Sequence, residues 1–483
     1  LIGLSLSGGI DTLSRGHGIR PAMSEEFDAV VAAVRERVTP DDEERERLRA
    51  VTERLTERTG AAADELPVET DTVLVGSTAR GTWLAGDRDV DLFVQFPADL
   101  DREDLEAYGL QVGREVLPDG REEYAEHPYT VGEFEGFSVD LVPCYDVADA
   151  TAIQSAVDRT PFHTAYLDER LDDDIAADVR VAKAFLKGIG VYGADLKTRG
   201  FSGFLTELLV LEYGGFRPFL DAAADWHPPV ELDPEDHAAE TFEDPLVVID
   251  PTDPERNVAA ALSPANVARL QHYARELLAD PREALFDSDD PDPLDAEAVR
   301  EAIAARGTTP VAITFDAPDL VDDQLWPQLR KSRRGVVAEL DRRGFDVFRS
   351  AAFAADRAVL FVELAVADRP AVERHDGPPV HVRDHARGFY EKYADAGTGD
   401  DSSAPTSPPY GPFVAEDRYV VERAREFTTA RGFLESDALF EVALGAHVES
   451  ALEDDYAVLV GDDVAALAEN FGVELARYFS PKP

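Results

Sequence analysis

The sequence predicts a mixed α+β protein of several domains, and three observations support that prediction. The chain has 483 residues, which is more than one hydrophobic core usually holds. Strand-like and helix-like segments are mixed over residues 24–150, whereas residues 155–275 are mainly helical in pattern. Strand-like runs return beyond the acidic, proline-bearing segment 286–300. We therefore expect a mixed N-terminal domain, a helical central domain and a mixed α/β C-terminal region.

The N-terminal domain is expected to hold two helices and three strands. The run TPDDEERERLRAVTERLTERTG predicts a helix with Pro40 in its first turn and its end at Gly60. Three strands are predicted by DTVLVGS, DVDLFVQF and FEGFSVDLVPCYDV. The run ADLDREDLEAYGL, between the second and third of them, predicts the other helix.

The remaining elements follow in order. Central helices are predicted by DDDIAADVRVAKAFLKGIGVYG, FSGFLTELLVLEYGGF and PANVARLQHYARELLAD. C-terminal strands are predicted by TPVAITFDAP and FDVFRSAAFAADRAVLFVELAV, and residues 396–412 predict a loop insertion. The expected divisions are an extension (1–22), a head (23–155), a central domain (156–290) and a C-terminal region (291–483).

The charge is strongly acidic throughout the chain. Asp and Glu total 98 against 47 Lys and Arg, which gives a formal net charge of −51, and only six of the bases are lysines. Intrinsic disorder is the competing interpretation, but periodic apolar segments recur along the whole length. A dispersed acidic surface that uses arginine in place of lysine indicates adaptation to molar salt, where charges are screened within about 3 Å.

Composition also excludes some classes of protein. The single cysteine, Cys144, excludes an internal disulfide and a cysteine-based zinc site. No apolar run approaches the length of about eighteen residues that a membrane span needs, and no signal peptide is visible. We expect a cytoplasmic protein. The chain begins at Leu1 and its one methionine is Met23, so we expect residues 1–22 to be a non-native or unstructured extension.

The most informative motif is a pair of carboxylates on one predicted strand. Because side chains alternate along a strand, Asp89 and Asp91 project from the same face. Neighbouring carboxylates repel one another unless a cation neutralises them, and oxygen ligands suit Mg²⁺. A Gly76-Ser77 turn precedes the pair with eleven residues between Ser77 and Asp89, where the backbone can approach a phosphate closely. The alternative is a solvated strand edge in a very acidic protein.

This motif resembles that of the polymerase-β-like nucleotidyltransferase superfamily. More narrowly, GSTARGTWLAGDRDVDLFVQFP, RTPFHTAYL, LKGIGVYGADLKTRGFSGFLTELLV and IDPTDPERNVAAALS resemble the archaeal (class I) CCA-adding enzymes. The resemblance covers nearly everything after Met23. It implies a polymerase-β-like head, a helical central domain that binds nucleotide and a C-terminal region that binds tRNA. One departure is Asp89, because relatives often have glutamate there.

The resemblance implies template-independent addition of C, C and A to the 3′ end of tRNA. CTP and ATP would be the substrates, and the tRNA 3′-hydroxyl would displace pyrophosphate with the help of two Mg²⁺ ions. Catalysis and metal binding would be carried by Asp89, Asp91 and the matching Asp140. The family often forms dimers, so a homodimer is a further expectation.

The same resemblance assigns residues to the nucleotide. They are Ser77, Arg80, His163, Lys183, Tyr192 and Arg256. Each has a structural alternative: His163 could satisfy a turn, for example, and Tyr192 could belong to the core. Asp87 matches no motif position and is interpreted as structural.

Other functions stay open at this point. A poly(A)-type polymerase would share the catalytic motif, a small-molecule nucleotidyltransferase would be shorter, and an RNA-binding scaffold would be expected to lose a metal carboxylate. RNA binding also conflicts with a charge of −51, so recognition must rest on shape, stacking and 2′-hydroxyl contacts. The basic run LRKSRRG (329–335) is a candidate contact with the tRNA backbone.

Overall fold

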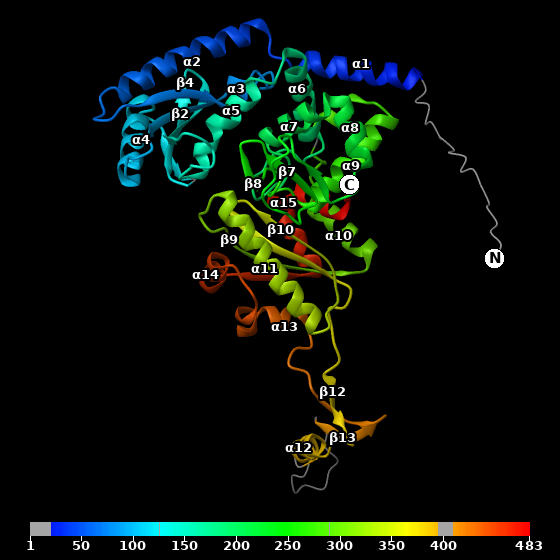
Figure 1. The fold of residues 1–483 in the computed structure, drawn as a ribbon. Helices are drawn as coiled ribbons and strands as arrows, with labels where there is room; N and C mark the ends of the chain where they lie inside the picture. Colours follow the sequence, from blue (N-terminus) through cyan, green and yellow to red (C-terminus); the bar gives the residue numbers. More distant parts are fainter. Residues whose placement is uncertain (1–20, 125, 289, 395–408) are drawn as a thin grey trace, which may run out of the picture. The chain divides into compact units, whose positions relative to one another are not determined.

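The computed structural model describes residues 21–124, 126–288, 290–394 and 409–483 (Figure 1). The chain divides into two compact units, one up to residue 289 and the other over residues 290–482. Each unit has its own sheets and hydrophobic clusters, and each is described by itself. The expected extension at residues 1–20 lies outside the described residues, whereas Pro21 and Ala22 belong to the first helix.

The first unit begins with a head built on a five-stranded sheet in the order β1-β2-β5-β4-β3. Its strands are β1 (Asp71–Val75), β2 (Asp89–Pro97), β3 (Arg121–Tyr124), β4 (Pro128–Phe134) and β5 (Phe137–Asp146). β2 and β5 run parallel and the other pairs are antiparallel. Helices α2 (Asp42–Ala63) and α4 (Arg102–Val116) bury Leu55 and Leu105 in the same hydrophobic cluster as Val90 and Leu92.

Two details of the head differ from expectation. The α2 helix starts after Asp41, whose side chain forms a capping box with Glu44, so Pro40 precedes the helix. Gly60 does not end it, because the helix continues to Ala63 and buries two alanines that favour helix. Strands β3 and β4 were not predicted: the REEY segment of β3 is charged and mostly exposed, so it lacks the apolar alternation that marks a strand.

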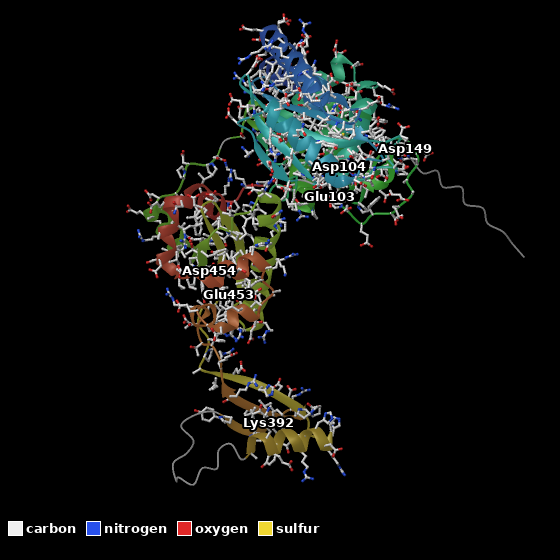
Figure 2. The ribbon with its side chains drawn as sticks, turned by 90° about the vertical axis from the view of Figure 1, so that its left-hand side faces the viewer. Glu103, Asp104, Asp149, Lys392, Glu453 and Asp454 are labelled. Atoms are coloured by element: carbon white, nitrogen blue, oxygen red, sulfur yellow. The ribbon has the colours of Figure 1, made fainter. Side chains whose placement is uncertain are left out.

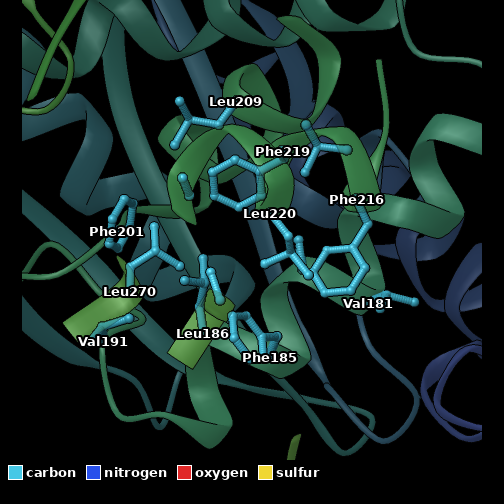
Figure 3. Close-up of a cluster of buried hydrophobic side chains, with 14 of the residues drawn as sticks. Val181, Phe185, Leu186, Val191, Phe201, Leu209, Phe216, Phe219, Leu220 and Leu270 are labelled. Atoms are coloured by element: carbon cyan, nitrogen blue, oxygen red, sulfur yellow. The ribbon is translucent and has the colours of Figure 1, made fainter. Parts of the chain in front are cut away.

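The rest of the first unit is mainly helical, as predicted. It contains α1 (Pro21–Val38), η1 (Ala156–Arg159), α5 (Thr160–Asp168), α6 (Asp173–Gly188), α7 (Gly203–Tyr213), α8 (Phe216–Asp225), α9 (Pro264–Ala279) and η2 (Glu283–Phe286). Figure 3 shows the core of these helices, where Phe185, Phe216 and Phe219 lie fully buried among leucines. A small sheet of β6 (Val230–Leu232), β7 (Leu246–Asp250) and β8 (Asp253–Asn257) was not predicted, because its strands are very short.

The second unit is mixed α/β, also as predicted. Its larger sheet has the order β10-β11-β9-β15, from β9 (Thr309–Asp316), β10 (Val347–Ala354), β11 (Arg357–Leu364) and β15 (Ala457–Val460). Its smaller sheet has the order β12-β14-β13, from β12 (Val372–Pro379), β13 (Tyr410–Ala415) and β14 (Arg418–Ala424). The helices are α10 (Ala296–Arg306), α11 (Asp322–Arg342), α12 (Arg383–Ala394), α13 (Ala430–Leu434), η4 (Asp437–Glu441), α14 (Ala446–Asp454), η5 (Gly461–Leu467) and α15 (Ala468–Phe479).

Two segment predictions in this unit need revision. The acidic linker expected at 286–300 gives way to α10 at Ala296, because Asp295 caps that helix with its carboxylate. Of the loop expected at 396–412, residues up to 408 lie outside the described residues, and Tyr410 begins β13.

Acidic side chains cover both units. Figure 2 shows examples: Glu103 and Asp104 on α4, Asp149, and Glu453 and Asp454 on α14, all of which are exposed. Lys392, one of the few lysines, is exposed on α12. Within the described residues, no helix is both long enough and apolar enough to cross a membrane.

Candidate active site

Three carboxylates share one face of the head sheet. β2 and β5 pair in parallel with Asp91 opposite Asp140 and Asp89 opposite Ser138, so all three aspartates point to the same side. The neighbouring residues of β2, Val90 and Leu92, point the other way into the core beneath α2 and α4. The side chains of β2 therefore alternate between the two faces of the sheet as the sequence predicted.

Two of the three carboxylates, Asp91 and Asp140, have raised pKa values. Burial raises the pKa of Asp91 to about 6, with further contributions from the negative charges of Asp140 and Asp89, against which Arg80 acts. Burial also raises the pKa of Asp140, together with the charges of Glu123 and Asp89. A group of like charges held together in this way is costly unless a cation joins it.

A glycine brings the preceding turn up against Asp91. β1 is antiparallel to β2 with Val75 opposite Asp91, and the chain then turns into the short helix α3 (Gly76–Ala79). Gly76 has φ +75°, and a Cβ there would lie 2.1 Å from Oδ2 of Asp91. The position therefore requires glycine both for its backbone conformation and for space. Ser77, the next residue, is half-buried at the start of this turn.

The donor set suits a hard divalent cation, which prefers carboxylate oxygens. Among the described residues, no three His, Cys, Asp or Glu side chains are close enough as they stand to hold a metal ion. The fit therefore rests on the chemistry of the donors and on their common face, which presents three carboxylates on the same side of the sheet. A divalent ion that drew them together would relieve the repulsion that contributes to the raised pKa values of Asp91 and Asp140.

A second charged group, which we call the buried cluster, consists of Arg80, Thr82, Lys183 and Glu207. Arg80 donates to Oε2 of Glu207 through Nε at 3.1 Å and through a terminal nitrogen at 2.7 Å. Lys183 donates to Oε1 of Glu207 at 2.8 Å and to both oxygens of Thr82 at 3.0 and 3.2 Å. The Glu207 side chain is fully buried. Although burial opposes it, Lys183 and Arg80 hold the pKa of Glu207 below its usual range.

Two residues that were predicted to bind nucleotide, Arg80 and Lys183, are instead paired with Glu207 inside the protein. Arg80 and Lys183 were expected to reach the nucleotide, yet their side chains are only 7% and 4% exposed and their donors are used within the protein. As they stand, they tie the head to helices α6 and α7. The sequence did not identify Glu207, although an acid inside the apolar run FLTELLV was a signal for a buried partner.

Two other predicted residues meet at a carboxylate. His163 on α5 and Arg256 on β8 both contact Oδ2 of Asp250, at 2.8 and 2.7 Å. The His163 ring also stacks on Phe204, with 3.8 Å between centroids. Burial lowers the pKa of His163, against the pull of Asp250. Asp250 and Phe204 were not predicted, because neither stands out in sequence beside the motif residues.

Tyr192 lies near the buried cluster and is half-buried. Burial, followed by the charges of Glu207 and Asp87, raises the pKa of its hydroxyl. The Nζ of Lys187 lies 5.5 Å from its ring centroid and 3.6 Å from Oδ1 of Asp87. Asp87 also accepts a hydrogen bond from the backbone of Leu84, which agrees with its structural interpretation.

Comparison with known proteins decides among the functions that the sequence left open. Family models match the chain in three successive parts: a nucleotidyltransferase domain over residues 60–163, the second domain of tRNA nucleotidyltransferase over 177–287, and the C-terminal domain of CCA-adding enzyme over 306–461. A CCA-adding enzyme of Haloarcula marismortui is 66% identical over 476 residues, which cover 95% of this chain and 100% of that protein. The chain belongs to the CCA-adding enzyme family.

Further relatives agree. CCA-adding enzymes of Halorubrum lacusprofundi and Halobacterium salinarum are 61% and 62% identical, over 95% and 94% of this chain and 100% and 99% of their own lengths. The resemblance stated from the motifs is confirmed, as are the α+β multidomain fold and the kinship with proteins of halophilic archaea. The protein is a CCA tRNA nucleotidyltransferase, so tRNA and nucleoside triphosphates are its substrates. The poly(A)-type and scaffold alternatives are set aside.

Proposed function

We propose that the three carboxylates form the metal-dependent centre that adds C, C and A to tRNA from CTP and ATP. The observation that supports this is the shared face of Asp89, Asp91 and Asp140 on two parallel strands. Mg²⁺ bound there would orient the triphosphate and stabilise negative charge on the attacking and leaving oxygens. Asp89 and Asp91 would hold the ion on the pyrophosphate side, and Asp140 would complete the second position.

The residues of the chain then have distinct tasks. Asp140, whose pKa is raised by burial and by its acidic neighbours, would accept the proton of the tRNA 3′-hydroxyl. The 3′-oxygen bonds to the α-phosphorus as the bond to the β-phosphate oxygen breaks. Gly76 allows the turn to approach Asp91, and the hydroxyl of Ser77, the next residue, would donate to the triphosphate.

We further propose that His163 and Arg256, held by Asp250, belong to the nucleotide site together with Tyr192. Arg80 and Lys183 would join it if nucleotide phosphates competed with Glu207 for these two cations. The Phe204 ring under His163 fixes the imidazole plane, which favours a positioning role for that pair.

The division of labour follows the predicted domains. We propose that residues 23–155 carry out the chemistry, that residues 156–290 bind nucleotide and that residues 291–483 bind the tRNA, including the basic run 329–335. A homodimer and a cytoplasmic location remain predictions.

The test uses tRNA that lacks its 3′-terminal CCA, in molar KCl with Mg²⁺. Each labelled nucleotide is offered separately, and CTP and ATP are then offered together. We expect growth by C, C and A that stops after three additions and is lost in Asp91→Ala. Unlimited addition of A would contradict the proposal, as would full activity of Asp91→Ala.

A further inference from the structure

A pocket of about 580 Å³ lies in the first unit. Its lining residues come from Pro40 and helix α2, strand β1, helix α3 and the turn after it, and helix α6. Leu74 of β1 lines it and pairs with Leu92, whereas Asp91 pairs with the next residue, Val75. Since side chains alternate along a strand, the pocket opens on the opposite face of the sheet from Asp91.

The pocket is basic in a protein with about twice as many acids as bases. Four arginines line it, Arg45, Arg49, Arg80 and Arg180, with Asp173 as the acidic residue of the lining. Arg80 is already paired with Glu207, and Arg49 with Glu46. Within the described part of the chain, neither Arg45 nor Arg180 has a carboxylate within ion-pair distance. Two guanidinium groups are thus available to an anion.

Of these two arginines, Arg180 gives the stronger indication that an anion binds in the pocket. The residue is only 8% exposed, and one terminal nitrogen donates to the carbonyl of Gly81. Its Nε has no hydrogen-bond partner among the residues that the structure describes. Burial lowers its pKa, and the positive charges of Arg45 and Arg35 lower it further, against the weaker effect of Asp173. A buried, incompletely bonded cation beside another cation is costly by itself, and a bound anion would remove that cost.

We propose that this pocket is a second ligand site, which binds the phosphate of a small organic phosphate of nucleotide size through Arg45 and Arg180. The planar guanidinium fork matches phosphate oxygens in geometry. The volume falls within the range of small-molecule sites, about 300–1,000 Å³. Leu48, Leu74 and Trp83 give part of the lining an apolar character, which suits a base or another non-phosphate group.

An RNA backbone is the competing source of phosphate, and the apolar side chains of Leu48, Leu74 and Trp83 within the lining favour the small ligand. A ligand in this pocket would contact α2 of the head, the turn at Gly81 and α6 together. Its binding is therefore expected to stabilise the joint between the head and the central helices, and hence to raise the midpoint of thermal unfolding.

The experiment measures binding to the full chain by calorimetry in molar KCl with EDTA, so that chloride is the constant competitor and divalent ions are absent. The probes are ATP, AMP, pyrophosphate, adenosine and a short single-stranded RNA. The variants are Arg45→Gln and Arg180→Gln, with Arg47→Gln as the matched control. Arg47 lies two residues from Arg45 on α2 but faces Phe137 and does not line the pocket.

We expect ATP and AMP to bind at this site and adenosine to fail there. Affinity at this site is expected to fall about tenfold or more in both test variants, and not in Arg47→Gln. Arg45 forms no ion pair with any described residue, so Arg45→Gln leaves none of their carboxylates without its partner and tests the site even if Arg180→Gln folds poorly. Equal binding by Arg45→Gln and the parent protein would overturn the proposal. So would binding of the RNA but of no mononucleotide, or a response to chloride alone.

Discussion

The carboxylate face and the buried cluster handle charge in opposite ways. On the carboxylate face, Asp89, Asp91 and Asp140 lie on the same side of the sheet. Burial, together with the negative charges of Asp140 and Asp89, raises the pKa of Asp91 to about 6. In the buried cluster, Glu207 lies between Lys183 and Arg80 and keeps a lowered pKa although it is fully buried. Among the described residues, no Lys or Arg forms an ion pair with the three aspartates, whereas Glu207 is paired with both Arg80 and Lys183.

The comparison distinguishes carboxylates that serve a ligand site from a carboxylate that stabilises the fold. A protein tolerates repelling carboxylates only where something else supplies the positive charge, which is typical of a catalytic metal site. A compensated buried network does not need a ligand, and removing one partner leaves a buried charge alone. The two regions should therefore respond to mutation in different observables.

The largest effect is expected from Asp91→Asn. Loss of a metal-binding carboxylate should lower the rate of CCA addition by about a thousandfold or more, since metal stabilisation of the transition state is worth several kcal/mol. Single-turnover addition of CMP to tRNA lacking CCA measures it. The matched control is Asp87→Asn, which should keep its rate within about tenfold. Similar losses in both variants would remove the distinction between the two aspartates.

The second effect concerns stability. Glu207→Gln should destabilise the protein by about 3–5 kcal/mol, because Arg80 and Lys183 then remain buried without their counter-charge. Denaturant unfolding in molar KCl measures the free energy. Glu212→Gln, an exposed position on the same helix, is the control and should change it by no more than about 0.5 kcal/mol. A small effect of Glu207→Gln would show that the cluster is not a structural tie.

Gly76→Ala tests the contact between the turn and Asp91. The new methyl would collide with the carboxylate, so activity should fall about a hundredfold in addition to a backbone cost of about 1–2 kcal/mol. The control is Gly81→Ala, which shares a positive φ of +66° but has nothing within 4 Å of its added carbon. It should show the backbone cost with little loss of activity. Equal activity losses would assign the effect to strain alone.

The smallest effect is a pH dependence at His163. Burial lowers the pKa of His163 from 6.5 in the folded protein. As the pH falls, His163 is therefore protonated in the unfolded chain before it is protonated in the folded protein, and the free energy of unfolding decreases. His163→Gln should make this slope shallower, measured by unfolding between about pH 7.5 and about pH 5.5. His227→Gln, at an exposed site, is the control for removal of a histidine. An unchanged slope in His163→Gln would contradict the assignment.

Sequence reasoning found what local periodicity determines. The side-chain alternation of β2 is a property of any strand, so Asp89 and Asp91 could be placed on one face before the fold was known. Asp140 needed the motif resemblance as well, because its position opposite Asp91 depends on the pairing of β2 with β5.

The partners of the predicted residues could not be found in the same way. Glu207 reaches Arg80 across 127 positions, and Asp250 reaches His163 across 87, so neither pairing has a local signature. The short strands β3 and β8 were not predicted for a different reason. Their sequences are charged and lack a strand pattern, so their conformation depends on pairing with neighbouring strands.

The most direct test of the central claim is thermal unfolding of the parent protein and Asp91→Asn with and without Mg²⁺, in molar KCl at neutral pH. Because the pKa of Asp91 is raised to about 6, its ionised form destabilises the fold at neutral pH. In the absence of metal, Asp91→Asn should therefore be at least as stable as the parent protein. Mg²⁺ should then stabilise the parent saturably, by about 2.7 kcal/mol at a hundred times the dissociation constant, and leave Asp91→Asn unchanged. An equal response of both proteins to Mg²⁺ would contradict the assignment of this face as the metal centre.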